Sequence, residues 1–303
     1  MLILHHYWPS PFAHKIRMAL GLANFDWMSV EIPRVPPKPL LTPLTAGYRR
    51  TPVLQIGADI YCDTQNIARA LAEQGASARL FPQASQASAL LVSDWVDQQL
   101  FPLAARVVIT SALETAPPEF VKDRGDLYFG AGWSIEQLQQ DFAGVLMQLR
   151  AGLSRLDGSL ATRMIDSSAD LGYADVAVAY LCWFIRGRWD QGPALLSQFP
   201  NLCRVEEAVC AVGHGNETTL DAEDALQIAA NSAPVSAIGV DQGTGFVVGQ
   251  AVSIRPFITS SDPEVQGTLR YLDATRVSID VCDPRVGDIA VHFPVFGYQM
   301  TAR

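Results

Sequence analysis

The sequence contains few of the residues that build metal centres and disulfide frameworks. Its 303 residues include five cysteines and five histidines, and no two cysteines stand in a CxxC arrangement. Structural zinc sites and dithiol redox centres depend on such closely spaced pairs, so we expect neither a metal site nor dithiol chemistry. An odd number of scattered cysteines is typical of a reducing compartment. The expected location is therefore the cytoplasm.

Long apolar runs and blocks of like charge are also missing. The most apolar stretch, residues 176–185, has ten residues, which is about half the length needed to span a bilayer. The N-terminus lacks the basic start and the apolar core of a signal peptide. The net charge is -9, and no five like charges follow one another. An acidic surface does not attract nucleic acid or an anionic membrane, so neither is an expected partner.

The N-terminal residues predict a strand, a tight turn and a helix. Residues 2–6 form a short β-type run that ends at Tyr7, and Pro11 then opens a helical pattern of apolar residues. A helix tolerates proline best in its first turn, which fits Pro11 as the start. At 303 residues the chain is long enough for two or three domains, and its 49% hydrophobic residues indicate a globular protein.

A β-hairpin and a second helix follow a proline-dense segment at residues 32–45. Two short apolar runs, residues 51–56 and 59–62, are separated only by Gly57-Ala58, which is typical of a hairpin. The next helical pattern begins at Thr64. The predicted order of the first 78 residues is therefore β-α-loop-β-β-α, a mixed α/β domain.

The remainder divides into a helical and a strand-rich part. After a linker at residues 75–86, helical periodicity dominates to residue 212. In residues 234–303, apolar and polar residues instead alternate with a period of two, in runs separated by Gly, Pro and Asp. We expect three domains, 1–78, 86–212 and 234–303, of which the last is a small antiparallel, barrel-like β module.

Two local features are suited to binding an anionic sulfur ligand. The turn from Tyr7 to Pro11 leads from a strand into a helix N-terminus, where N–H groups and the helix dipole favour an anion such as a thiolate. A hydroxyl there, from Ser10 or from Tyr7, could donate to bound sulfur. Lowering a thiol pKa by about two units requires about 2.7 kcal/mol, which one or two charge-assisted hydrogen bonds supply.

The second feature surrounds the predicted hairpin. A cis peptide bond at Pro52 would turn the backbone of Val53 outward, to pair with an extended peptide ligand. Asp63 and Thr64 open the next helix, where the hydroxyl and the N–H groups could hold a carboxylate and the Asp63 side chain an ammonium. Together these groups would grip an α-amino acid head group.

The segments that carry these features resemble the cytosolic glutathione S-transferase superfamily over roughly residues 1–212. They are YWPSPFAHKIRMAL, RRTPVLQIGADIYCDTQNIARAL and YADVAVAYL. The resemblance implies a thioredoxin-like domain that binds glutathione as co-substrate, a helical domain that lines the pocket for a small hydrophobic electrophile, no metal, a homodimer and a role in detoxification.

The resemblance also implies roles for individual residues. Ser10 matches the catalytic residue of the serine- and cysteine-type classes, with Tyr7 as its rival. Val53 matches the residue that pairs with the cysteinyl part of glutathione, and Asp63 and Thr64 match those at its γ-glutamyl end. Asp175 matches the capping aspartate of the helical domain, and the candidates for the glycyl carboxylate are Lys38, Arg49 and Arg50.

Two features depart from the family pattern. Gly172 stands where the capping hydroxyl is usual, and the β module at residues 234–303 is not part of the usual plan. The sequence therefore leaves two functions open. The first is a glutathione transferase that activates the thiol for attack on an electrophile. The second is a catalytically silent protein of the same fold, which uses the β module to recruit a partner.

Overall fold

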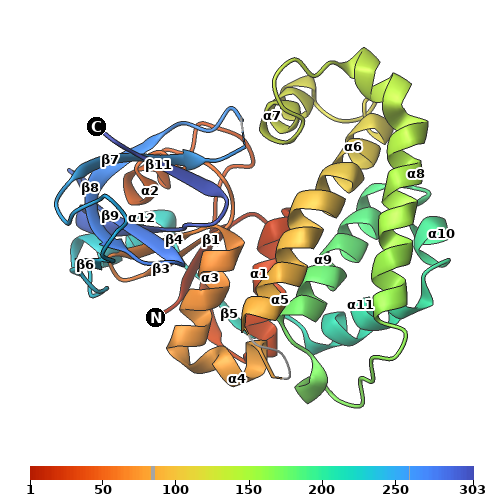
Figure 1. Cartoon of the computed structure of the whole chain (residues 1–303), viewed down its shortest axis with the longest axis horizontal. Coiled ribbons are helices and arrows are strands. Elements are labelled where there is room, and N and C mark those ends of the chain that lie inside the picture. The colour runs from red at the N-terminus through yellow and green to blue at the C-terminus, as the bar shows by residue number, and fades with distance from the viewer. Residues whose placement is uncertain (83–85, 259) are drawn as a thin grey trace. The chain divides into compact units, whose positions relative to one another are not determined.

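The computed structural model describes residues 1–82, 86–258 and 260–303. Its contacts divide the chain into two compact units. The first unit comprises residues 1–16, 25–70 and 216–303, and the second comprises residues 17–24 and 71–215. Figure 1 shows the sheet of the first unit and the helices of the second.

The N-terminal part of the first unit has the predicted thioredoxin-like order. Strand β1 (Ile3–His6) leads through helix α1 (Pro11–Leu22) to β2 (Asp26–Glu31), and β1 and β2 pair in parallel. Strands β3 (Val53–Ile56) and β4 (Asp59–Cys62) form the predicted hairpin, and α3 (Thr64–Leu71) follows. Gly57 has a φ of 62°, a backbone conformation that suits glycine in a two-residue turn.

The same unit contains all of the strands near the C-terminus. Helix α2 (Thr42–Thr45) lies between β2 and β3. The elements of this unit near the C-terminus are β5 (Asn216–Thr219), α12 (Ala222–Ala230), β6 (Gly239–Val240), β7 (Ala251–Pro256), β8 (Val265–Leu272), β9 (Arg276–Asp283), β10 (Gly287–Pro294) and β11 (Tyr298–Ala302). One sheet runs in the order β11-β7-β8-β9-β10-β4-β3-β1-β2-β5. Strand β10 joins its two parts because it pairs in parallel with β4, with Val291 opposite Ile60.

The predicted strand-rich C-terminal region is confirmed, but the barrel-like closure is not found because the sheet is open. Strand β4 would otherwise present unpaired N–H and C=O groups along one edge, and β10 satisfies them. The buried core is continuous across this junction and includes Val53 and Ile60 as well as Ile254 and Val291. The boundaries 1–78, 86–212 and 234–303 stay a prediction, whereas the compact units group the C-terminal strands with the N-terminal ones.

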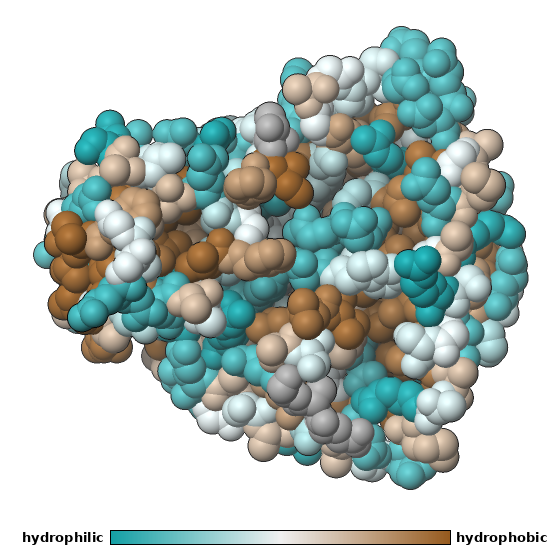
Figure 2. All heavy atoms as spheres, viewed as in Figure 1, coloured by the Kyte–Doolittle hydropathy of each residue, from teal (hydrophilic) through white to brown (hydrophobic). Residues whose placement is uncertain are grey.

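Large apolar side chains also reach the surface of the C-terminal region, and Figure 2 shows brown apolar atoms there between teal hydrophilic ones. The exposed residues include Val247, Val248, Phe257 and Phe296. Half or more of a typical protein surface is apolar, so these side chains do not by themselves mark an interface.

The second unit is helical, as the sequence predicts. Its segments are the π-helical η1 (Ala72–Ala76), α4 (Ser77–Leu80), α5 (Gln86–Trp95), the π-helical η2 (Val96–Leu100), α6 (Phe101–Ser111), α7 (Pro118–Tyr128), α8 (Ile135–Ser159), the 3-10 helix η3 (Ser168–Asp170), α9 (Tyr173–Arg188), α10 (Gly192–Leu196) and α11 (Pro200–Val212). Of the predicted linker, residues 83–85 lie outside the described part of the chain.

The start of α9 is capped by the predicted aspartate. The Asp175 carboxylate accepts a hydrogen bond from the Gly172 N–H at 2.8 Å and pairs with Arg163 at 2.6 Å. The ion pair compensates for the missing capping hydroxyl, because it fixes the carboxylate beside the first turn. Within the described residues, no helix has both the length and the apolar character needed to cross a membrane.

Candidate functional site

Ser10 caps the first helix and stands at the end of the turn that follows β1. Its Oγ accepts a hydrogen bond from the Ala13 N–H at 3.2 Å, and its own N–H donates to the Tyr7 carbonyl at 3.1 Å. Because Oγ is the acceptor in the capping bond, its hydrogen can be donated to another group. The side chain is buried, with 2% of the residue exposed. Ser10 thus presents a hydroxyl at the positive end of a twelve-residue helix.

Tyr7, the rival candidate, lies largely inside the hydrophobic core. Its ring belongs to a buried cluster with Leu41, Leu44 and Tyr48. Packing therefore accounts for the position of this side chain, and its catalytic role stays a prediction.

The peptide bond between Thr51 and Pro52 is cis, as the sequence predicts. Val53, however, lies inside the sheet, with His5 of β1 opposite it on one side and Cys62 of β4 on the other. An extended ligand therefore finds no open strand edge at Val53. The hairpin partner β4 is evident from the spacing of the two apolar runs, whereas the pairing of β3 with β1 is not. Thr51, which precedes β3 and is half-buried, is the residue of this turn outside the strand.

Lys38 lies against this turn, whereas the two candidate arginines contact the C-terminal region. The ammonium of Lys38 donates to the Arg49 carbonyl at 2.9 Å and to Thr51 Oγ1 at 2.8 Å. Arg50 pairs with Asp262 at 2.7 Å, and the Arg49 guanidinium donates to Ser261 Oγ at 3.2 Å. Lys38 is thus the candidate cation that the structure places beside Pro52.

Asp63 precedes α3 in a left-handed conformation, with a φ of 73°. Its Oδ1 accepts a hydrogen bond from the Gln65 N–H at 3.0 Å, which caps the helix, and its Oδ2 accepts one from the Tyr298 hydroxyl at 3.2 Å. The carboxylate predicted to hold an ammonium therefore already has a partner from β11. No sequence pattern connects Tyr298 with Asp63, so sequence reasoning missed this residue.

Lys15 is a second residue that sequence reasoning missed. It is fully buried, and its ammonium donates to Thr64 Oγ1 at 3.4 Å. A signal existed: Lys15 follows Phe12 by three residues and precedes Ala19 by four, so it lies on the buried stripe of α1. A positive charge thus stands beside the α3 N-terminus, where a ligand carboxylate was expected.

Two tyrosines, the buried Tyr48 and the half-buried Tyr298, adjoin Asp63. The hydroxyls of Tyr48 and Tyr298 lie 3.3 Å apart. Burial raises the pKa of the Tyr48 hydroxyl well above its usual value, and the negative charge of Asp63 adds to this effect. Burial likewise raises the pKa of Tyr298, with further contributions from Tyr48 and Asp63. Both phenols therefore remain protonated at neutral pH and can act as hydrogen-bond donors.

The strand register brings the separate pieces to one end of the sheet. His5, Val53 and Cys62 lie in one row across β1, β3 and β4. The turn to Ser10 leaves β1 close to this row, the Thr51–Pro52 turn enters it, and Asp63 and Thr64 follow it directly. One end of the sheet thus groups three features. They are the Ser10 hydroxyl at a helix N-terminus, the half-buried turn at Thr51, and the start of α3 beside the buried Lys15.

Known proteins resemble this chain in sequence and in fold. A family model described as the N-terminal domain of glutathione S-transferase matches residues 4–79. A GST-like protein from Pseudomonas syringae of known structure is 32% identical, with a TM-score of 0.77, over 100% of this chain and 99% of that one. The chain belongs to the glutathione S-transferase superfamily.

More distant relatives lie in the same superfamily. A probable glutathione S-transferase, parA, from Nicotiana tabacum is 22% identical over 187 residues, which cover 60% of this chain and 73% of that protein. A glutathione S-transferase from Methylobacillus flagellatus, solved with glutathione bound, is 19% identical with a TM-score of 0.51, over 70% of this chain and 99% of that one. At this identity the second likeness shows the fold alone. The alignment with the Pseudomonas syringae protein spans the whole of the present chain and so includes its C-terminal strands.

Proposed function

We propose that this protein binds glutathione at the end of the sheet where His5, Val53 and Cys62 form one row, and activates its thiol for attack on a small hydrophobic electrophile. The observation that carries the proposal is the grouping of Ser10, the cis Thr51–Pro52 turn and the Asp63–Thr64 helix start at one end of the sheet. The related transferase from Methylobacillus flagellatus, which was solved with glutathione bound, supports the choice of ligand.

Each part of the tripeptide has a chemically suitable group on this chain. Thr51, which lies outside β3, takes the place proposed from the sequence for Val53 and pairs with the cysteinyl main chain. Thr64, with Lys15 behind it, holds the γ-glutamyl carboxylate, and Asp63 holds the ammonium. Lys38 attracts the glycyl carboxylate. These contacts would fix the thiol near the N-terminus of α1.

Ser10 then stabilises the ionised thiol. Its hydroxyl donates a hydrogen bond to the sulfur while Oγ continues to accept from Ala13. A hydrogen bond to a charged group contributes about 1.5–3 kcal/mol, which corresponds to a thiol pKa lower by about one to two units. The thiolate sulfur forms a bond to the electrophilic carbon, and the leaving group departs with its electron pair. The thiol proton passes to solvent.

The decisive experiment measures the pKa of bound glutathione. Thiolate absorbance is titrated against pH for the protein and for Ser10→Ala, Ser10→Thr and Tyr7→Phe, and turnover is followed with a chlorodinitrobenzene. We expect Ser10→Ala to raise the pKa of the bound thiol by about one unit or more, while glutathione affinity by calorimetry changes little. Ser10→Thr retains a hydroxyl and should preserve most of the effect. An unchanged pKa in Ser10→Ala with a raised one in Tyr7→Phe would assign the role to Tyr7.

A catalytically silent binding protein is the second candidate. The observation in its favour is that the C-terminal region already engages groups at this end of the sheet, since Tyr298 of β11 donates to Asp63, and Asp262, between β7 and β8, pairs with Arg50. In this alternative, the β-rich region recruits a partner. Calorimetric binding of glutathione without any turnover, over a panel of aryl and alkyl halides and epoxides, would favour it.

The remaining parts of the proposal come from the family resemblance. We propose a cytoplasmic homodimer with a role in detoxification. Sedimentation velocity tests the assembly, and a purely monomeric species at micromolar concentration would contradict it.

A further inference from the structure

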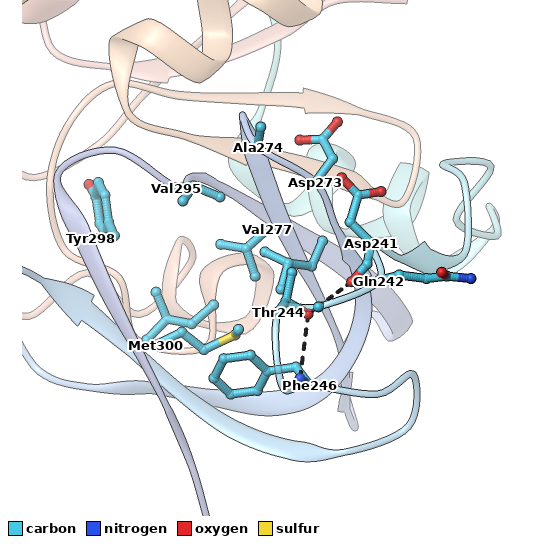
Figure 3. A pocket seen from close by; sticks show the side chains of 13 residues that line it. Asp241, Gln242, Thr244, Phe246, Asp273, Ala274, Val277, Val295, Tyr298 and Met300 are labelled. Carbon is cyan, nitrogen blue, oxygen red and sulfur yellow. Dashed lines mark hydrogen bonds between the residues drawn. The ribbon is translucent and has the colours of Figure 1, made fainter.

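The C-terminal strands form a pocket that the proposed glutathione chemistry does not use. It has a volume of about 500 Å³, within the range of natural small-molecule sites. Ile254, Leu272 and Val277 are buried and form its floor. Further apolar walls are half-buried, namely Phe246, Val295, Tyr298 and Met300. Figure 3 shows these side chains gathered around one space.

A short, internally bonded loop forms one rim of the pocket. Thr244 Oγ1 donates to the Asp241 carbonyl at 3.0 Å and accepts from the Phe246 N–H at 3.4 Å, as the dashed lines in Figure 3 mark. Gly243 and Gly245 have φ values of 84° and 78°, which side chains larger than hydrogen rarely tolerate. The loop therefore has a defined shape of its own.

The charges at the opening are negative. Asp241 and Asp273 both line the pocket, at the end away from Tyr298 in Figure 3. Asp273 accepts hydrogen bonds from the Tyr271 hydroxyl at 2.9 Å and from the Arg276 N–H at 2.7 Å. Burial alone would raise the pKa of Asp273, but hydrogen bonds from the Thr275 N–H at 2.6 Å, from the Arg276 N–H and from the Thr275 and Tyr271 hydroxyls outweigh it and lower the pKa. The Asp273 carboxylate therefore stays ionised at neutral pH.

No described residue that lines this pocket is a lysine, arginine or histidine. Arg276, whose guanidinium lies over the Tyr61 ring at 5.8 Å, is not part of the lining. An anionic ligand would thus meet two carboxylates without a compensating cation in the wall. Glutathione and its conjugates, which carry net negative charge, are unsuited to the pocket for that reason.

We propose that this pocket binds a small apolar molecule that carries a positively charged group, such as an aromatic or branched aliphatic amine. The apolar part lies on Ile254, Leu272 and Val277, where burial of its surface supplies the binding free energy. The ammonium lies at the rim between Asp241 and Asp273, which supply the preference for a cation. The residues assigned to hold this ligand, namely Ile254, Leu272, Val277, Asp241 and Asp273, have no part in the proposed glutathione site.

Three naphthalene probes of similar shape test both parts of the proposal by calorimetry, without glutathione. They are naphthylmethylammonium, the neutral methylnaphthalene and the anionic naphthylacetate. We expect the ammonium probe to bind saturably, with one site per chain, and about ten-fold or more tightly than the acetate probe. Asp241→Lys should weaken the ammonium probe by about five-fold and strengthen the acetate probe. Glu217→Lys, at an exposed carboxylate of β5, makes the same charge change elsewhere and should alter neither.

A filled pocket tests the location. Met300→Trp places a bulky ring from the edge strand β11 in the space and should lower the affinity for all three probes. Circular dichroism reports whether the fold is retained. If that variant fails to fold, the Asp241→Lys comparison decides. Absence of saturable binding by any probe would overturn the proposal. Equal affinity for the ammonium and acetate probes, or equal effects of Asp241→Lys and Glu217→Lys, would also overturn it.

Discussion

The hydroxyl of Tyr298 donates a hydrogen bond to Oδ2 of Asp63 at 3.2 Å. These residues are 235 positions apart in the chain, and the bond joins strand β11 to the residue that precedes α3. Tyr298 also lines the pocket of the C-terminal strands. One phenol therefore contacts the proposed ammonium-binding carboxylate and borders the second pocket.

We expect Tyr298 to act as a positioning residue for glutathione. Tyr298→Phe removes the donor and leaves Asp63 held by Gln65 alone, so glutathione affinity should fall by about three-fold, the order of one ordinary hydrogen bond. An analogue of glutathione without the α-amino group should bind both proteins equally, because it does not use Asp63. Tyr48→Phe is the matched control and should have the smaller effect. An equal loss for the analogue would point to a general structural role instead.

A second prediction concerns the buried charge of Lys15. Lys15→Met keeps the length and apolar stem of the side chain and removes the ammonium beside Thr64. Methionine keeps the apolar stem that packs in the core, so we expect the fold to persist, and circular dichroism checks it. Glutathione affinity should drop by about ten-fold or more, because the γ-glutamyl carboxylate loses a charged neighbour.

Two controls separate this effect from a loss of fold. Lys122→Met removes an exposed lysine and should leave affinity unchanged. An analogue without the γ-glutamyl carboxylate should bind Lys15→Met and the unmodified protein alike. If Lys15→Met bound glutathione as tightly as the unmodified protein, Lys15 would be structural.

The third prediction is loss of stability on acidification. Burial lowers the pKa of His5 to about 4, although the hydrogen bond that its imidazole donates to Gln55 Oε1 at 2.8 Å opposes this shift. In the unfolded chain His5 therefore becomes protonated near pH 6.5, whereas in the folded chain it stays neutral until the pH approaches 4. The free energy of unfolding consequently falls as the pH drops below about 6.5. Between about pH 7 and about pH 5 this residue should cost on the order of 2 kcal/mol of unfolding free energy.

Chemical denaturation at several pH values measures the effect. His5→Gln can still bond to Gln55 but does not titrate, so its stability should fall less on acidification. His214, whose pKa burial also lowers to about 4, is present in both proteins and cancels in the comparison. Parallel pH curves for the two proteins would refute the assignment to His5.

Local features of the chain were predictable because each depends on a few neighbouring residues. The hairpin at Gly57, the cis bond at Pro52 and the helix start after Asp63 all follow from short-range patterns. The helical domain follows from sustained periodicity, and the Asp175 cap from the family resemblance.

Features that depend on long-range pairing were not predictable. A period of two predicts that β10 is a strand, but it does not say that its partner is β4. The enclosure of Val53 depends on the pairing of β3 with β1, and the contact between Tyr298 and Asp63 joins residues 235 positions apart. The burial of Lys15 was visible in the helical spacing, yet a lysine is by default assigned to the surface.

The fourth prediction concerns removal of the C-terminal strands. The sequence alone favours a truncated protein, ending near Pro234, that stays soluble. The structure favours the opposite result, because β10 pairs with β4 and the buried His292 imidazole donates to Asp59 at 3.0 Å. Without residues 234–303, the edge of β4 and the core side chain of Ile60 would be exposed, and exposed apolar edges aggregate.

Expression of residues 1–233 and separation of the soluble and insoluble fractions measure the outcome. A chain that ends at Phe296 is the matched control, since it removes only the outer strand β11 and leaves β10 against β4. We expect the longer chain to remain folded and the shorter one to aggregate. If residues 1–233 formed a monodisperse protein with a cooperative thermal transition, the C-terminal strands would be a separable module, and the boundary predicted at residue 234 would be restored.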